Sequence, residues 1–285
     1  MMDILPNEIK SQILELLEME EYLKVNLLNS QWNDLFLINK KRLRRKSADE
    51  IRFYDLGDGQ IQVQIVLEGT PHWTKQIISK TVAPDNVFSC VWPYSPKEMH
   101  INSFSNALKE IFEAFPDYWF CGIEKLGIFE EKSNVNAMDL MRRCPDLHSI
   151  SIDPCFSDIH VTAILNTMKR INELKLPSTN QHIVADDSSL QKIIEKSKND
   201  EIGLRTFWVD SIPTNFSLEM VEQFLLESHF ADRCSILLQK IHGSDFEFVN
   251  FLRRHFELIS QIGAAFTFRN AQNSEITVII GSFER

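Results

Sequence analysis

The sequence predicts an α/β protein, with a short helical unit at the N-terminus and a larger domain of alternating strands and helices behind it. Three observations predict this fold class. Apolar residues recur at helical spacing through the first 46 residues. A Leu-x-x-Leu-x-Leu pattern occurs four times after residue 120. Helical patterns fill the intervals between these four segments.

The first 46 residues predict three short helices. Pro6 suits the first turn of a helix, and Glu8 favours the positive end of the helix dipole. A second helix begins near Met19, and Asn29 can cap a third. The apolar stripes are Ile9, Ile13, Leu16 and Leu17, then Leu23, Leu27 and Leu28, then Trp32, Leu35, Phe36 and Leu43. Because so short a segment buries its apolar groups poorly alone, it is either a subdomain packed on the main body or a docking module.

The order and spacing of these residues resemble an F-box. The family's apolar positions match Leu5, Pro6, Ile9, Ile13, Leu14, Leu17, Leu23, Leu28 and Trp32. The resemblance covers Leu5 to about Leu43 and implies that these residues bind the adaptor Skp1, and through it a cullin. Two departures stand out: residues 18–21 replace the usual Pro-rich turn before the second helix, and Asn29 replaces the usual Ser or Cys before the third.

Composition narrows the class of protein. Hydrophobic residues make up 44% of the 285 residues and charged residues 25%, and the formal net charge is −10, which opposes binding to nucleic acid or anionic lipid. No apolar stretch is long enough to span a bilayer, and the first residues lack the layout of a signal peptide. The five cysteines are scattered and never spaced as CxxC. These features predict an intracellular protein, cytoplasmic or nuclear, with free thiols.

A basic cluster covers residues 40–46, Lys-Lys-Arg-Leu-Arg-Arg-Lys. It is either a solvated helix end, where cations suit the negative end of the dipole, or a nuclear-import signal or contact for an acidic partner. The cluster also marks the predicted domain boundary, with the F-box at 1–46 and a recognition domain at 47–285.

Around the repeats, the sequence predicts a hairpin formed by residues 51–56 and 61–67, with Gly57-Asp58-Gly59 in its turn. Residues 70–100 contain four prolines and predict mostly loop and short strand, and residues 104–115 predict a helix that Pro116 ends. After residue 215, the patterns predict a helix at 217–228, a strand at 235–241 and a helix at 246–259. A closing hairpin is predicted from residues 264–269 and 275–283.

The four repeated segments begin at Ile123, Leu147, Ile171 and Leu204. Helical patterns lie between them at 135–143, 159–169 and 188–196, so residues of about 120–215 resemble irregular leucine-rich repeats flanked by hairpins. The alternative is a generic α/β domain with parallel strands. An F-box followed by such units and a closing hairpin also resembles the nematode families with an F-box-associated domain.

Motifs for catalysis are missing from the sequence. There is no GxGxxG, P-loop, GxSxG or HExxH. Cys144, His148, Cys155 and His160 have ligand types that suit zinc, but their spacing matches no standard zinc pattern. The sequence therefore predicts a non-catalytic protein with no metal and no cofactor.

A binding surface is the remaining candidate site. In Leu-x-x-Leu-x-Leu strands the leucines point inward, and the residues between them face outward. The outward positions are Lys125, Gly127, Phe129, Ser149, Ser151, Asp153, Glu173, Lys175, Pro177, Thr206, Trp208 and Asp210. We expect Phe129, Trp208, Lys175, Asp153 and Asp210 to contact a substrate protein, with the two aromatic rings as anchors. The alternative is that both rings are buried under the flanking hairpins.

Together these features predict a substrate-recognition subunit of a Skp1–cullin–F-box ubiquitin ligase, which holds an unidentified protein for ubiquitin-dependent degradation. Two other hypotheses remain. The chain could be an interaction scaffold without a ligase role, or a nucleic-acid adaptor that uses residues 40–46.

Overall fold

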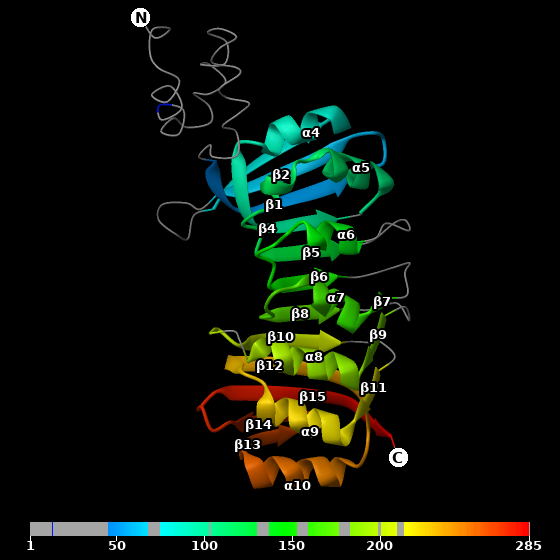
Figure 1. Ribbon diagram of the computed structural model, residues 1–285, viewed down its shortest axis with the longest axis vertical. Coiled ribbons are helices and arrows are strands. Elements are labelled where there is room, and N and C mark those ends of the chain that lie inside the picture. Colours follow the sequence, from blue (N-terminus) through cyan, green and yellow to red (C-terminus); the bar gives the residue numbers. More distant parts are fainter. Residues whose placement is uncertain are drawn as a thin grey trace, which may run out of the picture.

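A computed structural model describes Ile13 and residues 45–67, 75–102, 104–129, 137–152, 159–176, 183–198, 201–209 and 214–284. Figure 1 shows the strands stacked along the long axis of the molecule, with helices on one side of them. The described residues form one mixed, mostly parallel sheet.

The strands of the main sheet follow one another in the spatial order β13-β14-β15-β12-β10-β8-β6-β5-β4-β1-β2-β3. Their bounds are β1 Lys46–Asp55, β2 Ile61–Leu67, β3 Gln76–Val82, β4 Tyr94–Asn102, β5 Lys125–Phe129, β6 Ser149–Ile152, β8 Glu173–Leu176, β10 Leu204–Val209, β12 Phe230–His242, β13 Glu257–Ile262, β14 Ala265–Arg269 and β15 Glu275–Glu284. In this spatial order, each pair of neighbouring strands between β15 and β1 is parallel. The antiparallel pairs lie at the two ends of the sheet and are β1–β2 and β2–β3 at one end and β13–β14 and β14–β15 at the other.

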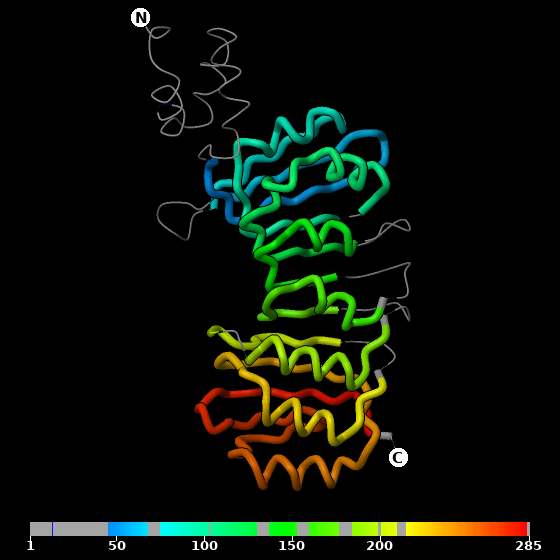
Figure 2. Tube along the Cα trace, viewed as in Figure 1, coloured from blue at the N-terminus to red at the C-terminus, as the bar shows by residue number. Residues whose placement is uncertain are grey.

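The helices cover one face of this sheet, as the trace in Figure 2 also shows. They are α4 Pro84–Val91, α5 Asn106–Ala114, α6 Ala137–Arg142, α7 Val161–Thr167, α8 Asp187–Ser197, α9 Leu218–Glu227 and α10 Asp245–His255, with a 3-10 turn, η2, at Asp117–Trp119. Contacts between aromatic rings hold the helices against the sheet. The ring centres of Phe112 in α5 and Phe53 in β1 lie 5.0 Å apart, and those of Phe248 in α10 and Phe266 in β14 lie 5.4 Å apart. Alternate strand residues enter this core, as period-two burial requires.

Three short strands lead directly into helices. They are β7 Ile159–His160, β9 Ile183–Asp186 and β11 Thr214–Ser217, and they pair in parallel beside the ends of the main strands (Figure 1). The last residue of each short strand is also the N-cap of the next helix: His160 for α7, Asp186 for α8 and Ser217 for α9. Asp187 accepts hydrogen bonds from the backbone N and hydroxyl of Ser217, at 2.8 and 2.7 Å, and so links α8 to α9.

The predicted fold class, an N-terminal three-helix F-box followed by an irregular leucine-rich-repeat-like domain, is wrong. The described residues form a mixed α/β structure on one mostly parallel sheet, which begins at Lys46 and ends at Glu284. Of residues 1–44 the structure describes Ile13 alone, which is helical, so no three-helix unit is seen in the described chain. The flanking hairpins are not separate units either, because β1 pairs with β4 and β15 pairs with β12. Pairing of this kind satisfies strand edges that would otherwise be open.

Several predicted elements are confirmed locally. The four repeated segments each carry a strand, β5, β6, β8 and β10, and the two hairpins form at β1–β2 and β14–β15. Two predictions fail. Residues 84–91 form the helix α4, which begins at Pro84 in its first turn. The helix predicted at 246–259 ends at His255, because Glu257–Ile262 pairs with β14.

Candidate functional site

The sheet face opposite the helices is the candidate site, here called the uncovered face. The strand registers align its outward residues in two rows across the sheet. One row contains Glu50, Glu98, Lys125, Ser149, Glu173, Thr206 and Ser235, and the other contains Arg52, His100, Gly127, Ser151, Lys175, Trp208 and Leu237. Segments far apart in the sequence thus contribute to one continuous surface.

Trp208, Lys175 and Phe129 all lie on this face. Trp208 is 41% exposed, its indole Nε1 donates a hydrogen bond to Ser235 Oγ at 3.1 Å, and Lys175 Nζ lies 5.8 Å from the centre of its ring. Phe129 is half-buried and stacks on His100, with ring centres 5.9 Å apart and planes 2° apart. The flanking hairpins therefore do not bury Trp208, whereas Phe129 is partly covered by a side chain of the neighbouring strand.

The other predicted site residues lie outside the described residues. Asp153 and Asp210 belong to this group, and so do the predicted Skp1-binding residues other than Ile13: Leu5, Pro6, Ile9, Leu14, Leu17, Leu23, Leu28 and Trp32. Only the C-terminal end of the basic cluster is described. There, Arg45 donates hydrogen bonds to the carbonyl oxygens of Tyr118 and Trp119, and burial lowers the pKa of its guanidinium. Arg45 is thus part of the packed domain rather than a solvated basic tail.

A hollow of about 330 Å³ lies in the middle of the uncovered face, over β5 and β6. Gly127 and Ser151 are small, and they lie between the His100–Phe129 stack on one side and Lys175 beside Trp208 on the other. A Cβ atom at Gly127 would collide with the ring of His100, so glycine is what allows this ring to lie over the strand. The hollow can hold a side chain of a partner.

A chain of charges borders the hollow. Arg52 donates two hydrogen bonds to Glu50, at 2.6 and 2.7 Å, and His100 Nε2 lies 3.3 Å from Glu50 and 3.8 Å from Glu98. Lys125 Nζ lies 3.0 Å from the other oxygen of Glu98. The sequence pointed to Lys125 but missed Glu50, Arg52, Glu98 and His100, although Arg52 and His100 each lie between two buried residues of their strand.

His100 and Lys125 together lower the pKa of the Glu98 carboxyl to about 2, against the partial burial that raises it. Since the pKa is lowered on folding, Glu98 stabilises the protein at pH values above 4.5, the pKa of the unfolded state, and this stability is lost as the pH falls toward 2.

We expect Glu98→Gln to unfold at a lower urea concentration than the wild type at about pH 6, with the difference shrinking at about pH 3. Equal destabilisation at both pH values would contradict this account. The companion variant is Lys125→Met, which removes one cause of the lowered pKa of Glu98. The range of pH over which the stability contributed by Glu98 is lost should therefore become narrower.

The four residues considered for zinc have other roles or lie outside the described chain. Burial raises the pKa of the Cys144 thiol to about 12, and its Sγ donates to the carbonyl of Leu140 at 3.5 Å. His148 contacts Ser149 Oγ at 3.0 Å and Glu124 at 3.6 Å, whereas Cys155 is not described. Within the described ranges no group of three or more histidines, cysteines and carboxylates could hold a metal ion.

His160, Asp186 and Thr162 form an arrangement that resembles a hydrolytic triad at first sight. His160 Nε2 lies 3.2 Å from Asp186 Oδ2, and Thr162 Oγ1 lies 2.5 Å from His160 Nδ1. However, His160 Nδ1 also accepts a hydrogen bond from the backbone N of Thr162, and Asp186 accepts from the backbone N of Ser188. Both side chains therefore cap helices, and this arrangement is structural.

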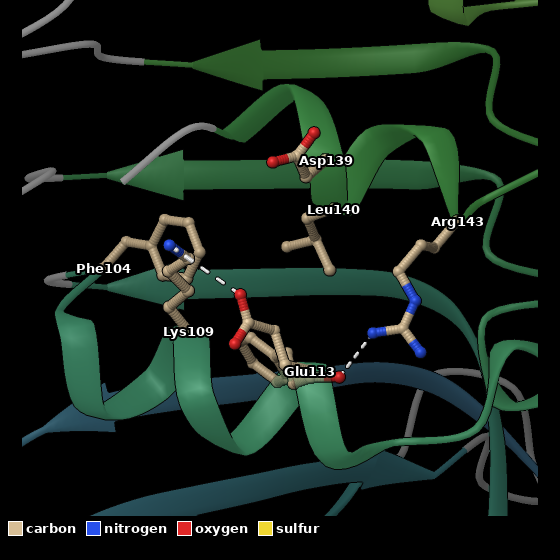
Figure 3. Close-up of a pocket in the computed structure, with 7 residues that line it drawn as sticks. Phe104, Lys109, Glu113, Asp139, Leu140 and Arg143 are labelled. Atoms are coloured by element: carbon tan, nitrogen blue, oxygen red, sulfur yellow. Dashed lines mark hydrogen bonds and ion pairs between the residues drawn. The ribbon is translucent and has the colours of Figure 1, made fainter. Parts of the chain in front are cut away.

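A second, much smaller cavity of about 40 Å³ lies between α5 and α6 (Figure 3). Its opening is bordered by Lys109 and Glu113, which form an ion pair at 3.7 Å. Arg143 lies at its edge, donating to the backbone carbonyls of Phe112 and Phe115 and, through Nε, to Asp117 at 2.7 Å. This cavity is close to the volume of a single water molecule, so Arg143 here joins two helices rather than forming a ligand site.

Among the helices of the described residues, none combines the length and the apolar character that a membrane span requires. Comparisons of the chain with protein-family models, with curated proteins and with solved structures found no match.

Proposed function

We propose that the chain is a substrate-recognition subunit of a Skp1–cullin–F-box ubiquitin ligase in an intracellular compartment. One observation carries the proposal: the chain joins an F-box-like motif, from Leu5 to about Leu43, to a domain whose sheet has helices on only one face among the described residues. The motif supplies the docking half. The uncovered face, with an exposed tryptophan beside a hollow, supplies the recognition half.

The mechanism under this proposal is proximity. Residues of the motif bind the adaptor, the uncovered face binds a protein, and the ligase raises the effective concentration of that protein's lysines around the conjugating enzyme. The chain itself makes and breaks no bond. Arg45 supports such coupling, since it follows the motif segment directly and its guanidinium is held by two backbone carbonyls of the recognition domain.

The test is capture of the purified full chain by immobilised Skp1. We expect the wild type to be retained and the triple variant Leu5→Ala, Pro6→Ala, Ile9→Ala to be lost, because these apolar residues would form the contact. A matched control, Ile77→Ala, Leu226→Ala, Phe246→Ala, removes three exposed apolar side chains of the other domain and should be retained.

The alternative is an interaction scaffold without a ligase role. The departure at residues 18–21, where an acidic stretch replaces the usual Pro-rich turn, is the observation that favours it. Failure of a well-folded wild type to bind Skp1 would select the scaffold and reject the ligase adaptor.

A further inference from the structure

The C-terminal half of the uncovered face carries a row of apolar side chains. The registers of β10, β12, β15, β14 and β13 place Trp208, Leu237, Ile279, Ala265 and Ile262 side by side. Trp208, Ile279 and Ile262 are 41%, 36% and 78% exposed, and Leu237 and Ala265 are half-buried. This apolar row crosses five strands, and four strand spacings of about 4.8 Å make it about 19 Å long.

A second row beside it consists entirely of hydroxyl side chains. It contains Thr206, Ser235, Thr277, Thr267 and Ser260 in the same registers, and the hydroxyls of Thr267 and Thr277 lie 3.2 Å apart. None of these ten positions is charged, although 25% of the chain is charged. Depletion of charge together with exposed aromatic and aliphatic side chains is what distinguishes the centre of a protein interface.

The end of the apolar row at Trp208 is cationic. Lys175 lies over the indole ring. Arg205 is exposed at the irregularity of β10 between Leu204 and Thr206, and its charge repels that of Lys125, although Glu98 raises the pKa of that lysine overall. In the part of the chain that the structure describes, these three cations face two carboxylates, Glu98 and Glu173, and no carboxylate there pairs with Arg205. A local excess of positive charge in a chain of net charge −10 is unusual, and it favours an acidic group on the partner.

We propose that the uncovered face binds a partner segment in which one or two carboxylate residues adjoin a run of uncharged aliphatic residues. The carboxylates lie over Arg205 and Lys175, and the aliphatic side chains cover Trp208, Ile279 and Ile262. About six residues of extended chain span 19 Å, so a short segment is sufficient. The inference rests on the proposed function in that it names the substrate class of the recognition face.

The experiment measures binding of fluorescent nine-residue peptides to the purified full chain. The first peptide has two glutamates followed by alternating leucine and serine, the second has lysines in place of the glutamates, and the third has serine in place of every leucine. We expect the first peptide to bind at least tenfold more tightly than the other two. Equal binding of the first two, or no binding of the first, would overturn the proposal.

Three variants locate the contact. Ile279→Arg places a charge in the middle of the apolar row and should abolish binding of the first peptide. Arg205→Glu should reverse the preference in favour of the lysine peptide. Ile77→Arg, at an exposed position of the edge strand β3, is the matched control and should bind as the wild type does. Unchanged binding by Ile279→Arg would also reject the proposal.

The peptide assay needs no adaptor, and Skp1 capture needs no peptide. Peptide binding without Skp1 capture would reject the ligase role and leave the recognition surface standing. Skp1 capture without peptide binding would reject the recognition surface and leave the ligase role standing.

Discussion

Replacing Phe115 by alanine should lower the free energy of unfolding by about 3–5 kcal/mol, the usual loss for a buried phenylalanine. Phe115 is 2% exposed and ends α5. Its ring centre lies 4.7 Å from Phe88 of α4, 4.9 Å from Trp119 of η2 and 5.6 Å from Phe112. The substitution therefore leaves a cavity where three helical segments meet, and edge-to-face ring contacts are lost as well.

Urea unfolding of the wild type and the variant measures this loss. Phe246→Ala is the matched control, because Phe246 also lies on a helix but is 71% exposed. This variant should change the free energy of unfolding by no more than about 0.5 kcal/mol. A loss below about 1 kcal/mol for Phe115→Ala would mean that the cluster closes around the cavity and contributes little to stability.

The second large effect is expected at Arg143. We expect Arg143→Ala to destabilise the protein by about 2–4 kcal/mol, because the guanidinium donates to two backbone carbonyls and one carboxylate while lying 4.3 Å from the centre of the Phe120 ring. The carbonyls of Phe112 and Phe115 at the end of α5 lose this donor, and the Phe112 carbonyl keeps its bond from the Phe115 N–H.

The neighbouring Arg142 provides the control. Its side chain is 61% exposed and pairs with Asp139 within its own helix, and such surface pairs contribute about 0.5 kcal/mol or less. Thermal unfolding of the two alanine variants side by side compares a cross-link between helices with a surface ion pair. Equal shifts in the two unfolding temperatures would show that the bonds of Arg143 to the backbone of α5 add nothing.

Local sequence patterns were sufficient to predict the strands in which apolar and polar residues alternate most clearly. Leu126 and Ile128 point into the core and Lys125 points away from it, because neighbouring strand residues lie on opposite faces of any sheet. The same rule placed Trp208 and Lys175 on the outward face. Local chemistry could also have found α4, since Pro84 and Asp85 suit the first turn of a helix.

The lateral order of strands was not contained in these patterns. Glu98 and His100 border the hollow, and Glu50 and Arg52 continue their chain of charges, only because β1 pairs in parallel with β4, and β4 with β5. Helix α10 ends at His255 because residues 257–262 find a partner in β14, although their apolar spacing also suits a helix. A strand's hydrogen-bonding edge has no side-chain signature, so its neighbour depends on the whole chain.

Local patterns are enough to predict which residues alternate between core and surface, where most helices begin, and which residues make up the F-box-like motif of the proposed docking half. Which surface residues lie next to one another depends instead on the pairing of strands that are distant in the sequence. The apolar row exists because β15, the last strand, inserts between β12 and β14 and brings Ile279 beside Leu237 and Ala265. Backbone pairing between distant segments fixes that register, and no local periodicity records it.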